Sequence, residues 1–473
     1  MGEIRTRDFD VTVIGGGPAG MGAALAAHAT GASTVIIERN EHLGGILRQC
    51  IHPGFGLTHF KEELTGPEYA QRFIDKVSES GIETMLGSMA LAINGGKGNE
   101  RRGGGGAGIP ADDVCAEREA PAADGHTVTV MTESGMVEIS CRSVVLAMGC
   151  RERTRSEIKI PGSRPAGVFT AGLAQRYINI ENLRPGKRVV ILGSGDIGLI
   201  MARRCALEGL EVEGVYELMP YANGLHRNVK NCLEDFGIPL HLSTTVTRVM
   251  GRDRVEAVEV SRVGADLSPI PGTERIVPCD ALLLSVGLIP ENEIAQAAGV
   301  ELDPRTRGAR VDQDLQTGVP GIFSCGNVLH VHDLADNVTA EAERAGTSAA
   351  AWARSRMGTP EAVEVLANES GPKAAEPADG AGCALNIPVS AEGLAGYVVP
   401  SRITRAISTK LFFRVKRPVE QARLVISSGG EVIFAGKPRG FKPSIMESAP
   451  LTAKILERTG GELTLSIEPI EEL

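Results

Sequence analysis

Two short glycine-rich stretches carry the residue types that hold a dinucleotide. The first is Gly15-Gly16-Gly17-Pro18-Ala19-Gly20 and the second is Gly193-Ser194-Gly195-Asp196-Ile197-Gly198. Both have the spacing G-x-G-x-x-G, in which the first glycine makes a tight turn, the second lets backbone approach a pyrophosphate, and the third lets a helix pack on a strand. The phosphates then lie at a helix N-terminus, where free N–H groups and the helix dipole favour negative charge.

Each stretch sits in a strand–turn–helix–strand pattern that ends in an acid. The first turn follows the apolar run 10–14, and Glu38 ends the next apolar run; the second follows 188–192, and Glu217 ends its next run. An acid about 20 residues after such a turn accepts a hydrogen bond from a ribose hydroxyl. A lone glycine motif is often only a turn. Because strand, helix and acid agree at both places, we expect two dinucleotide sites, one for a flavin and one for a nicotinamide.

Three further apolar runs end in glycine, which suits backbone that passes close to a cofactor. They are 144–148 before Gly149, 281–286 before Gly287, and 321–325 before Gly326-Asn327. A helix expected over about 336–354 begins with acidic or amide residues. Its N-terminus would point at the O2 edge of the flavin, where negative charge collects on reduction.

Composition excludes several classes of protein. The net charge is −10 and aromatic residues make up only 4%, so nucleic acid is not expected as a partner. No apolar run approaches the roughly 20 residues of a membrane-spanning helix, and an acidic start is wrong for a signal peptide, so we expect a cytoplasmic protein without an integral membrane segment. The nine cysteines include no CxxC pair, which predicts neither a disulfide framework nor a metal or iron–sulfur site.

The last part of the chain, residues 386–473, has a different character. Short strands are expected at 411–415, 422–426, 432–434 and 463–467, with a hairpin turn at Ser428-Gly429-Gly430. This part has 12 Lys and Arg against 9 acids, while the whole chain is at −10, so a +3 region joins a −13 body. It predicts either an accessory or dimerising domain, since an oligomer is expected, or a docking face for an acidic redox partner.

Several longer phrases resemble a known family: residues 49–57 (QCIHPGFGL), 64–70 (LTGPEYA), 149–155 (GCRERTR), 170–172 (TAG) and 325–333 (CGNVLHVHD). With the paired glycine motifs, the chain over about 8–355 resembles the pyridine nucleotide-disulfide oxidoreductase superfamily. The phrases are similar to the branch of FAD/NAD(P)-binding oxidoreductases associated with glycerol-3-phosphate-dehydrogenase-like flavoproteins. That branch is related to the alpha subunits of opine oxidase, cyanide synthase and dye-linked proline dehydrogenase.

The resemblance implies cofactors and partners. FAD is expected at Gly15, Gly17, Gly20, Glu38, Gly44, Gly45, Gly149, Gly326 and Asn327, and NAD(P)H at Gly193, Gly195, Gly198, Glu217 and Gly287. NADH is expected to be preferred, because Glu217 repels a 2′-phosphate and the next three residues supply no cation. The family implies a partner flavoprotein dehydrogenase and a small Cys-containing protein.

The expected fold is α/β, with two Rossmann-like dinucleotide-binding domains of three-layer ββα type and a small β-rich C-terminal domain. We expect the following boundaries: 1–155 for the first FAD-binding segment, with a flexible insertion at 94–125; 156–285 for the connector and NAD(P)-binding domain; 286–357 for the second FAD-binding segment; 358–385 for a linker; and 386–473 for the C-terminal domain.

The chain departs from the family at two places. The cysteine pair that disulfide reductases carry after Gly44-Gly45 falls here on Leu47 and His52, with Cys50 out of register. The thioredoxin-reductase CxxC is missing too, which disfavours a thiol-disulfide reductase. Where the family has Gly-Asp, this chain has Gly326-Asn327, whose amide can still hydrogen-bond a ribityl hydroxyl.

Two groups of polar residues near the expected flavin have open roles. Cys50 and His52 lie on the loop that should approach the flavin, and are either catalytic, as a proton donor or a gate, or only part of the loop's packing. Two ligands do not make a metal site, so none is predicted there. His330, His332 and Asp333 either handle protons or form structural hydrogen bonds.

The leading hypothesis is therefore an FAD-dependent NAD(P)H oxidoreductase. It would pass hydride between nicotinamide and flavin, and electrons to or from a partner flavoprotein or other acceptor. The alternative is a non-catalytic electron-relay or assembly subunit of a multi-subunit dehydrogenase of glycerol-3-phosphate, amino-acid or opine type.

Overall fold

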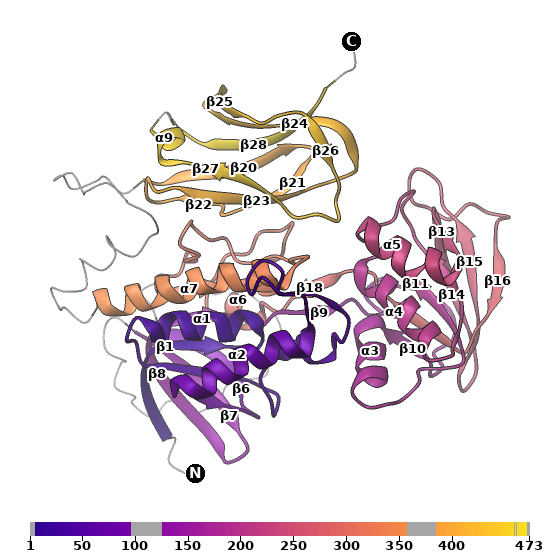
Figure 1. Cartoon of the computed structure of the whole chain (residues 1–473), viewed down its shortest axis with the longest axis horizontal. Coiled ribbons are helices and arrows are strands. Elements are labelled where there is room, and N and C mark those ends of the chain that lie inside the picture. Colours follow the sequence, from indigo (N-terminus) through magenta and orange to yellow (C-terminus); the bar gives the residue numbers. More distant parts are fainter. Residues whose placement is uncertain (1–4, 96–124, 357–384, 458, 460, 471–473) are drawn as a thin grey trace, which may run out of the picture.

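The computed structural model describes residues 5–95, 125–356, 385–457, 459 and 461–470. Figure 1 shows three bodies, which we call the first unit (5–95, 125–149 and 291–356), the second unit (153–287) and the C-terminal unit (the described residues from 385 to 470). Nearly all of the expected insertion (94–125) and linker (358–385) falls outside the described residues.

A seven-stranded sheet organises the first unit in the order β5-β2-β1-β8-β7-β6, with β19 also paired to β8. The strands are β1 (Arg5–Ile14), β2 (Thr34–Ile37), β5 (Glu83–Met85), β6 (Met89–Gly95), β7 (His126–Thr132), β8 (Gly135–Leu146) and β19 (Ile322–Ser324). The pairs among β5, β2, β1, β8 and β19 are parallel, whereas β7 is antiparallel to β8 and β6 to β7. The parallel register aligns Ile14 and Ser324 with Leu146, so β1, β8 and β19 end at the same edge.

Helices α1 (Pro18–Ala29), α2 (Gly66–Ser80) and α7 (Ala335–Ser355) belong to this unit, and α1 packs on both of the others (Figure 1). The contact between α1 and α7 is so close that a Cβ added at Gly346 would lie 2.0 Å from the carbonyl oxygen of Ala23. Helix α2 begins with a capping box, in which Thr65 and Glu68 satisfy each other's backbone N–H groups.

The second unit has three layers. A parallel sheet has the order β10-β17-β11-β12-β13 and lies between an antiparallel sheet and helices. Along β11 the side chains alternate: Val189 and Ile191 pack with the helices, whereas Val190 and Leu192 pack with the antiparallel sheet. Its elements are β10 (Val168–Thr170), α3 (Ala171–Asn179), β11 (Arg188–Leu192), α4 (Asp196–Leu207), β12 (Glu211–Tyr216), α5 (His226–Cys232), η2 (Glu234–Phe236), β13 (Leu240–His241), β14 (Thr244–Gly251), β15 (Val255–Arg262), β16 (Arg275–Pro278) and β17 (Ala281–Leu284).

The chain leaves the first unit and returns to it through one antiparallel ribbon, β9 (Cys150–Glu152) paired with β18 (Leu288–Pro290). Shorter elements complete the first unit. These are η1 (Gly45–Gln49), β3 (Pro53–Phe55), β4 (Leu64–Thr65), α6 (Glu293–Ala297) and η3 (Gly326–Val328).

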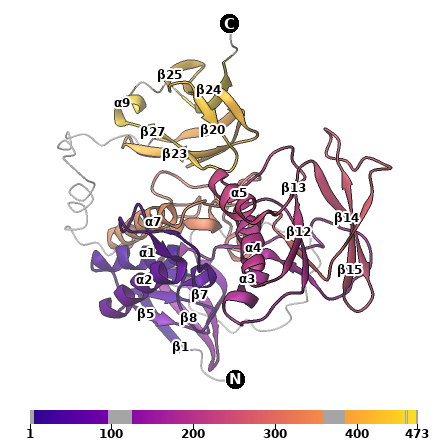
Figure 2. The same cartoon turned by 45° about the vertical axis from the view of Figure 1, so that its right-hand side comes forward.

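The C-terminal unit consists of two small sheets around its own apolar core, in which Phe413, Phe441 and Leu465 are buried. Figure 2 shows this unit stacked above the first unit. One sheet has the path β22-β20-β28-β24-β25, with β26 on β24, and the other is β21-β23-β27. Its elements are β20 (Ile387–Gly393), β21 (Ala395–Val399), β22 (Arg402–Ile403), β23 (Thr409–Val415), β24 (Val419–Ser428), β25 (Glu431–Ala435), β26 (Arg439–Phe441), β27 (Glu447–Leu451), α9 (Ala453–Leu456) and β28 (Leu463–Pro469).

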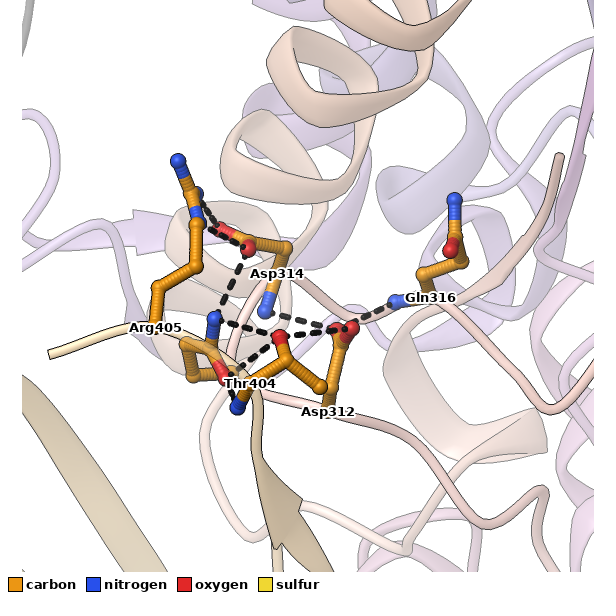
Figure 3. Close-up of polar contacts among 6 residues, drawn as sticks. Asp312, Asp314, Gln316, Thr404 and Arg405 are labelled. Atoms are coloured by element: carbon orange, nitrogen blue, oxygen red, sulfur yellow. Dashed lines mark hydrogen bonds and ion pairs between the residues drawn. The ribbon is translucent and has the colours of Figure 1, made fainter. Parts of the chain in front are cut away.

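Polar contacts fix the C-terminal unit to the first unit (Figure 3). The Thr404 hydroxyl donates to the buried carboxylate of Asp312 at 3.3 Å, and Arg405 pairs with Asp314. The Ser401 N–H adds a backbone hydrogen bond to Val311, at 2.9 Å. The C-terminal unit is therefore seated on the first unit.

The α/β fold with two Rossmann-like units and a β-rich end is confirmed. The helix expected after the first glycine turn is α1, and the helix expected over about 336–354 is α7. Gly429 and Gly430 form the turn between β24 and β25 with positive φ values of 57° and 86°. Among the described helices, none is long and apolar enough to cross a membrane.

The packing of α1 on α7 generates a stability prediction. Gly346→Ala should lower the free energy of unfolding by about 1–3 kcal/mol, because its Cβ would overlap backbone that cannot move aside. Alanine normally stabilises a helix relative to glycine, so the expected sign is reversed. The matched control is Gly22→Ala in α1, where the added Cβ would have ordinary contacts at 3.5 Å. Urea unfolding measures both; equal stability of the two variants would contradict the close contact.

Candidate functional site

The first glycine turn leaves no room for side chains at two of its positions. Gly15 follows β1 with a φ of 108°, and a Cβ there would lie 2.4 Å from the carbonyl oxygen of Ala147. At Gly20 an added Cβ would lie 1.7 Å from the carbonyl oxygen of Gly15. These glycines are therefore required by the close packing of strand, turn and helix.

The second turn repeats this geometry in the second unit. Gly193 follows β11 with a φ of 99°, and its Cβ would lie 2.1 Å from the carbonyl oxygen of Ser285. A Cβ at Gly198 would lie 2.5 Å from the carbonyl oxygen of Gly193. The two turns are therefore built alike.

The middle glycine of each turn is different. Gly17 and Gly195 have φ values of −77° and −64°, which any residue can adopt. A Cβ at Gly17 would meet nothing nearer than 4.0 Å, and one at Gly195 nothing nearer than 3.6 Å. Both are N-caps, of α1 and α4, without a side-chain capping bond. Open space thus lies before helix N-termini whose first N–H groups have no side-chain acceptor, which suits an anion such as a pyrophosphate.

A buried carboxylate reaches back to each turn. Glu38, just after β2, accepts from the N–H of Gly16 at 2.6 Å and from the N–H of Asn40 at 2.8 Å. Glu217, just after β12, accepts from the N–H of Ser194 at 2.9 Å and from its hydroxyl at 2.6 Å. Both residues are at most 5% exposed. Each acid is therefore held at the end of its strand, beside the open space.

Two of the other expected flavin residues also meet the first turn. The N–H of Gly44 donates to the carbonyl oxygen of Gly16 at 2.9 Å. Gly44 and Gly45 have φ values of 106° and 54°, and a Cβ at Gly45 would lie 3.0 Å from the Cα of Gly17. The Gly44-Gly45 turn therefore closes one side of the open space.

The remaining glycines lie at the same sheet edges. Gly149 follows β8, and an added Cβ there would find no atom within 4 Å. Gly326 follows β19 with a φ of 73° and packs against Ala19 at the start of α1. The side-chain oxygen of Asn327 accepts the N–H of His332 at 3.0 Å. In the second unit, Gly287 follows β17 with a φ of 104° and is likewise unobstructed, with Arg153 nearest.

The loop that carries Cys50 and His52 lies at the seam between the first and second units. Gln49 donates to the carbonyl oxygen of Gly172 at 2.7 Å, and Asn179 of α3 donates to the carbonyl oxygen of Gln49 at 2.8 Å. Cys50 is half-buried, and desolvation raises the pKa of its thiol to about 12. The thiol is therefore protonated at neutral pH. Burial lowers the pKa of His52, so its imidazole is neutral there.

The structure adds an acid that was not predicted from the sequence, Glu341, to His330 and His332. Both imidazoles contact the carboxylate of Glu341 in α7, with Nε2–O distances of 2.8 Å and 3.2 Å. The same carboxylate accepts the N–H of Gly326 at 2.7 Å. All three side chains are at most 2% exposed. The sequence signal that could have identified Glu341 is a glutamate among the alanines of the buried face of α7.

The charge state of this cluster follows from its hydrogen bonds. Burial alone would raise the pKa of Glu341, but the two imidazoles hold it far below its usual value, while burial lowers the pKa of His330. A metal-bound imidazole normally donates its other N–H to an acceptor. Nδ1 of His330 and Nδ1 of His332 have no hydrogen-bond partner within the described ranges. The cluster therefore fits a carboxylate that accepts from both imidazoles, and it lacks the second acceptors that metal-bound imidazoles normally have.

Asp336, expected at the start of the helix and found in the first turn of α7, is another buried acid, and its contacts were not predicted from the sequence. Its carboxylate accepts the backbone N–H groups of Gly56, Thr58 and His59, at 3.0, 3.0 and 2.6 Å. It thereby fixes the end of the Cys50 loop to the helix whose N-terminus was expected at the flavin.

Several curated proteins are similar to this chain in sequence. Dihydrolipoyl dehydrogenase, mitochondrial, of Caenorhabditis elegans is 28% identical over 343 residues, which cover 68% of this chain and 64% of that protein. An opine oxidase subunit from Agrobacterium tumefaciens is 24% identical, with 67% and 61% covered, and the hydrogen cyanide synthase subunit HcnB from Pseudomonas protegens is 25% identical, with 61% and 58% covered. The chain thus spans less than two thirds of the length of these relatives. The expected likeness to opine oxidase and cyanide synthase subunits is confirmed.

Two solved structures have the same fold. Thioredoxin reductase of T. acidophilum superposes with a TM-score of 0.55 at 22% identity and covers 75% of this chain and 100% of its own. The bacillithiol disulfide reductase Bdr of Bacillus cereus gives 0.56 at 15% identity, with 74% and 100% covered. Residues 9–349, more than half of the chain, match the pyridine nucleotide-disulphide oxidoreductase family. The glycine turns, the two buried acids and this match together show that the chain belongs to the pyridine nucleotide-disulphide oxidoreductase family.

Proposed function

We propose that the protein is an FAD-dependent NAD(P)H oxidoreductase, with FAD in the first unit and the nicotinamide dinucleotide in the second. The observation that carries the proposal is the open space at Gly17 and Gly195, where the backbone would accept a side chain and the chain places none. A buried acid beside each space supplies an acceptor for a ribose hydroxyl.

The chain's own residues would bind and orient the two cofactors. The N–H groups at the start of α1 and α4 would hold the two pyrophosphates, and Glu38 and Glu217 the two riboses. When bound, the cofactors supply the hydride chemistry, so no side chain is required as a nucleophile. Asn327 offers an amide to the ribityl chain. The protein's contribution is alignment of two reactive rings.

The loop that carries Cys50 and His52 lies between the first and second units. Cys50 and His52 stay candidates for proton transfer there, but the raised pKa of Cys50 disfavours any step that needs its thiolate near neutral pH. Among the described cysteines all are free, and none forms a disulfide with Cys50. Hydride transfer without a thiol relay is therefore the proposed route.

Matched valine variants test the two sites. Gly17→Val should yield a folded but colourless protein, because the side chain would enter the space for pyrophosphate and its Cβ would meet no protein atom nearer than 4.0 Å. Gly195→Val should keep FAD yet lose reduction by NADH. Visible absorbance and stopped-flow flavin reduction measure these outcomes.

Each valine variant is the control for the other, and the thermal unfolding of Gly17→Val should match that of wild-type protein stripped of FAD. Full flavin in Gly17→Val, or a wild-type rate of reduction in Gly195→Val, would show that the site assignment is wrong.

NADH should be used in preference to NADPH. Glu217 is ionisable, buried and beside the expected ribose, so a 2′-phosphate would meet negative charge. Glu217→Gln keeps an acceptor for the N–H of Ser194 but removes the charge, and should narrow the preference. Steady-state kcat/KM with both nucleotides decides this. A wild-type preference for NADPH would overturn the role given to Glu217.

A second candidate is an electron-relay subunit that works with a partner flavoprotein. Two of the relatives are named as subunits, one of opine oxidase and one of hydrogen cyanide synthase. The C-terminal unit is also cationic on an acidic body. In this version, electrons leave the flavin for a partner chain that holds the substrate site.

Partner coupling should be sensitive to salt. Turnover with the co-purified partner should fall as the Debye length drops from about 10 Å at 0.1 M to about 3 Å at 1 M ionic strength. The exposed charge-reversal variants Arg417→Glu and Lys437→Glu should weaken coupling while NADH-driven dye reduction is unchanged. A protein that turns over a defined metabolite at full rate alone would contradict the relay candidate.

A further inference from the structure

The C-terminal unit reaches the segment that joins β19 to α7. Arg414 of β23 donates to the carbonyl oxygen of Val331 at 3.2 Å. Val331 lies between His330 and His332 in the sequence, so this bond ties Arg414 to the histidine segment. Its other terminal nitrogen donates to the carbonyl oxygen of Pro443 at 2.9 Å, which fixes the guanidinium. The N–H of Met446 donates to the Asp333 carboxylate at 3.0 Å. The C-terminal unit therefore covers the segment 330–333 of the first unit.

Aromatic side chains of the C-terminal unit complete the cover. The rings of Tyr397 and Phe412 lie edge-on to His330, with centroid distances of 6.1 Å and 6.0 Å. Burial is the main cause that raises the pKa of Tyr397, to about 12, so its hydroxyl stays neutral. The fixed charges around the cluster are then the carboxylates of Glu341 and Asp333 and the guanidinium of Arg414.

Glu341 is joined directly to the turn where the flavin is expected. Its carboxylate accepts the N–H of Gly326, and the next residue, Asn327, accepts the N–H of His332. Burial lowers the pKa of His330, and its Nδ1 has no hydrogen-bond partner among the described residues. The carboxylate of Glu341, whose pKa the two imidazoles hold far below its usual value, therefore brings a negative charge to this turn.

We propose that Glu341 and Arg414 are opposed positioning charges of the flavin site: the carboxylate lowers the reduction potential of the flavin held at Gly326-Asn327, and the guanidinium from the C-terminal unit raises it. Hydride transfer from NADH releases NAD⁺ and adds one negative charge to the flavin. A nearby anion opposes that charge and a nearby cation favours it. This inference rests on the proposed placement of FAD.

The test is the midpoint potential of the bound flavin in the full-length holoprotein, from equilibration with a reference dye. Glu341→Gln should shift the flavin–dye equilibrium toward reduced flavin by roughly tenfold, and Arg414→Gln should shift it the opposite way. Arg414→Lys keeps the charge and should restore a near wild-type equilibrium. The controls are Glu343→Gln, a half-exposed acid on the same helix, and Arg423→Gln, an exposed cation of the same unit.

The outcomes separate this inference from the proposed function. A wild-type protein without FAD would overturn the proposed function. A yellow wild type in which Glu341→Gln and Arg414→Gln leave the potential unchanged, or shift it in the same direction, would overturn the opposed charges alone. If Glu341→Gln does not fold, the comparison of Arg414→Gln with Arg414→Lys decides: equal potentials would overturn the inference.

Discussion

The rest of the structure depends on two glycine N-caps, at the start of α1 and of α4, where no side-chain capping bond is made. At α1 and α4 the N-cap is glycine and no side chain occupies its place, although the backbone there would allow one. The outer glycines of each turn press against neighbouring backbone, so the turns cannot relax into the space. Glu38 and Glu217 then fix each turn from behind. Uncapped helix ends are costly unless something fills them.

The three units meet through specific polar contacts. Gln49 and Asn179 tie the Cys50 loop to α3, and Asp312 and Asp314 tie the first unit to the C-terminal unit. The narrow ribbon of β9 and β18 is the route by which the chain itself passes between the two nucleotide units. The second unit is therefore joined to the first unit through the two strands of this ribbon. The C-terminal unit, in contrast, packs directly on the first unit.

Local sequence patterns were sufficient to predict much of the fold and several residues of the candidate site. The G-x-G-x-x-G turns, the strands that end in Gly149, Gly287 and Gly326, and the hairpin at Gly429-Gly430 depend on residues adjacent in sequence, and the sequence placed them. Glu341, Asp336 and Gln49 could not be placed in this way, because their partners lie 9 to 280 residues away and are brought near only by folding. The anchoring of Arg414 is similar, because the sequence alone does not distinguish an exposed arginine from one whose guanidinium is fixed by distant carbonyl oxygens.

The pairing of β19 with β8 has a consequence for biosynthesis. These strands are separated by the whole second unit, and α7, which packs on α1, comes later still. During translation the second unit is complete before the first can close, so part of the edge of β8 waits unpaired as the chain emerges. Such long-range closure is slow because the loop entropy is lost before the contacts form. A flavin that binds at Gly326 as proposed must therefore enter late, when most of the chain has already been made.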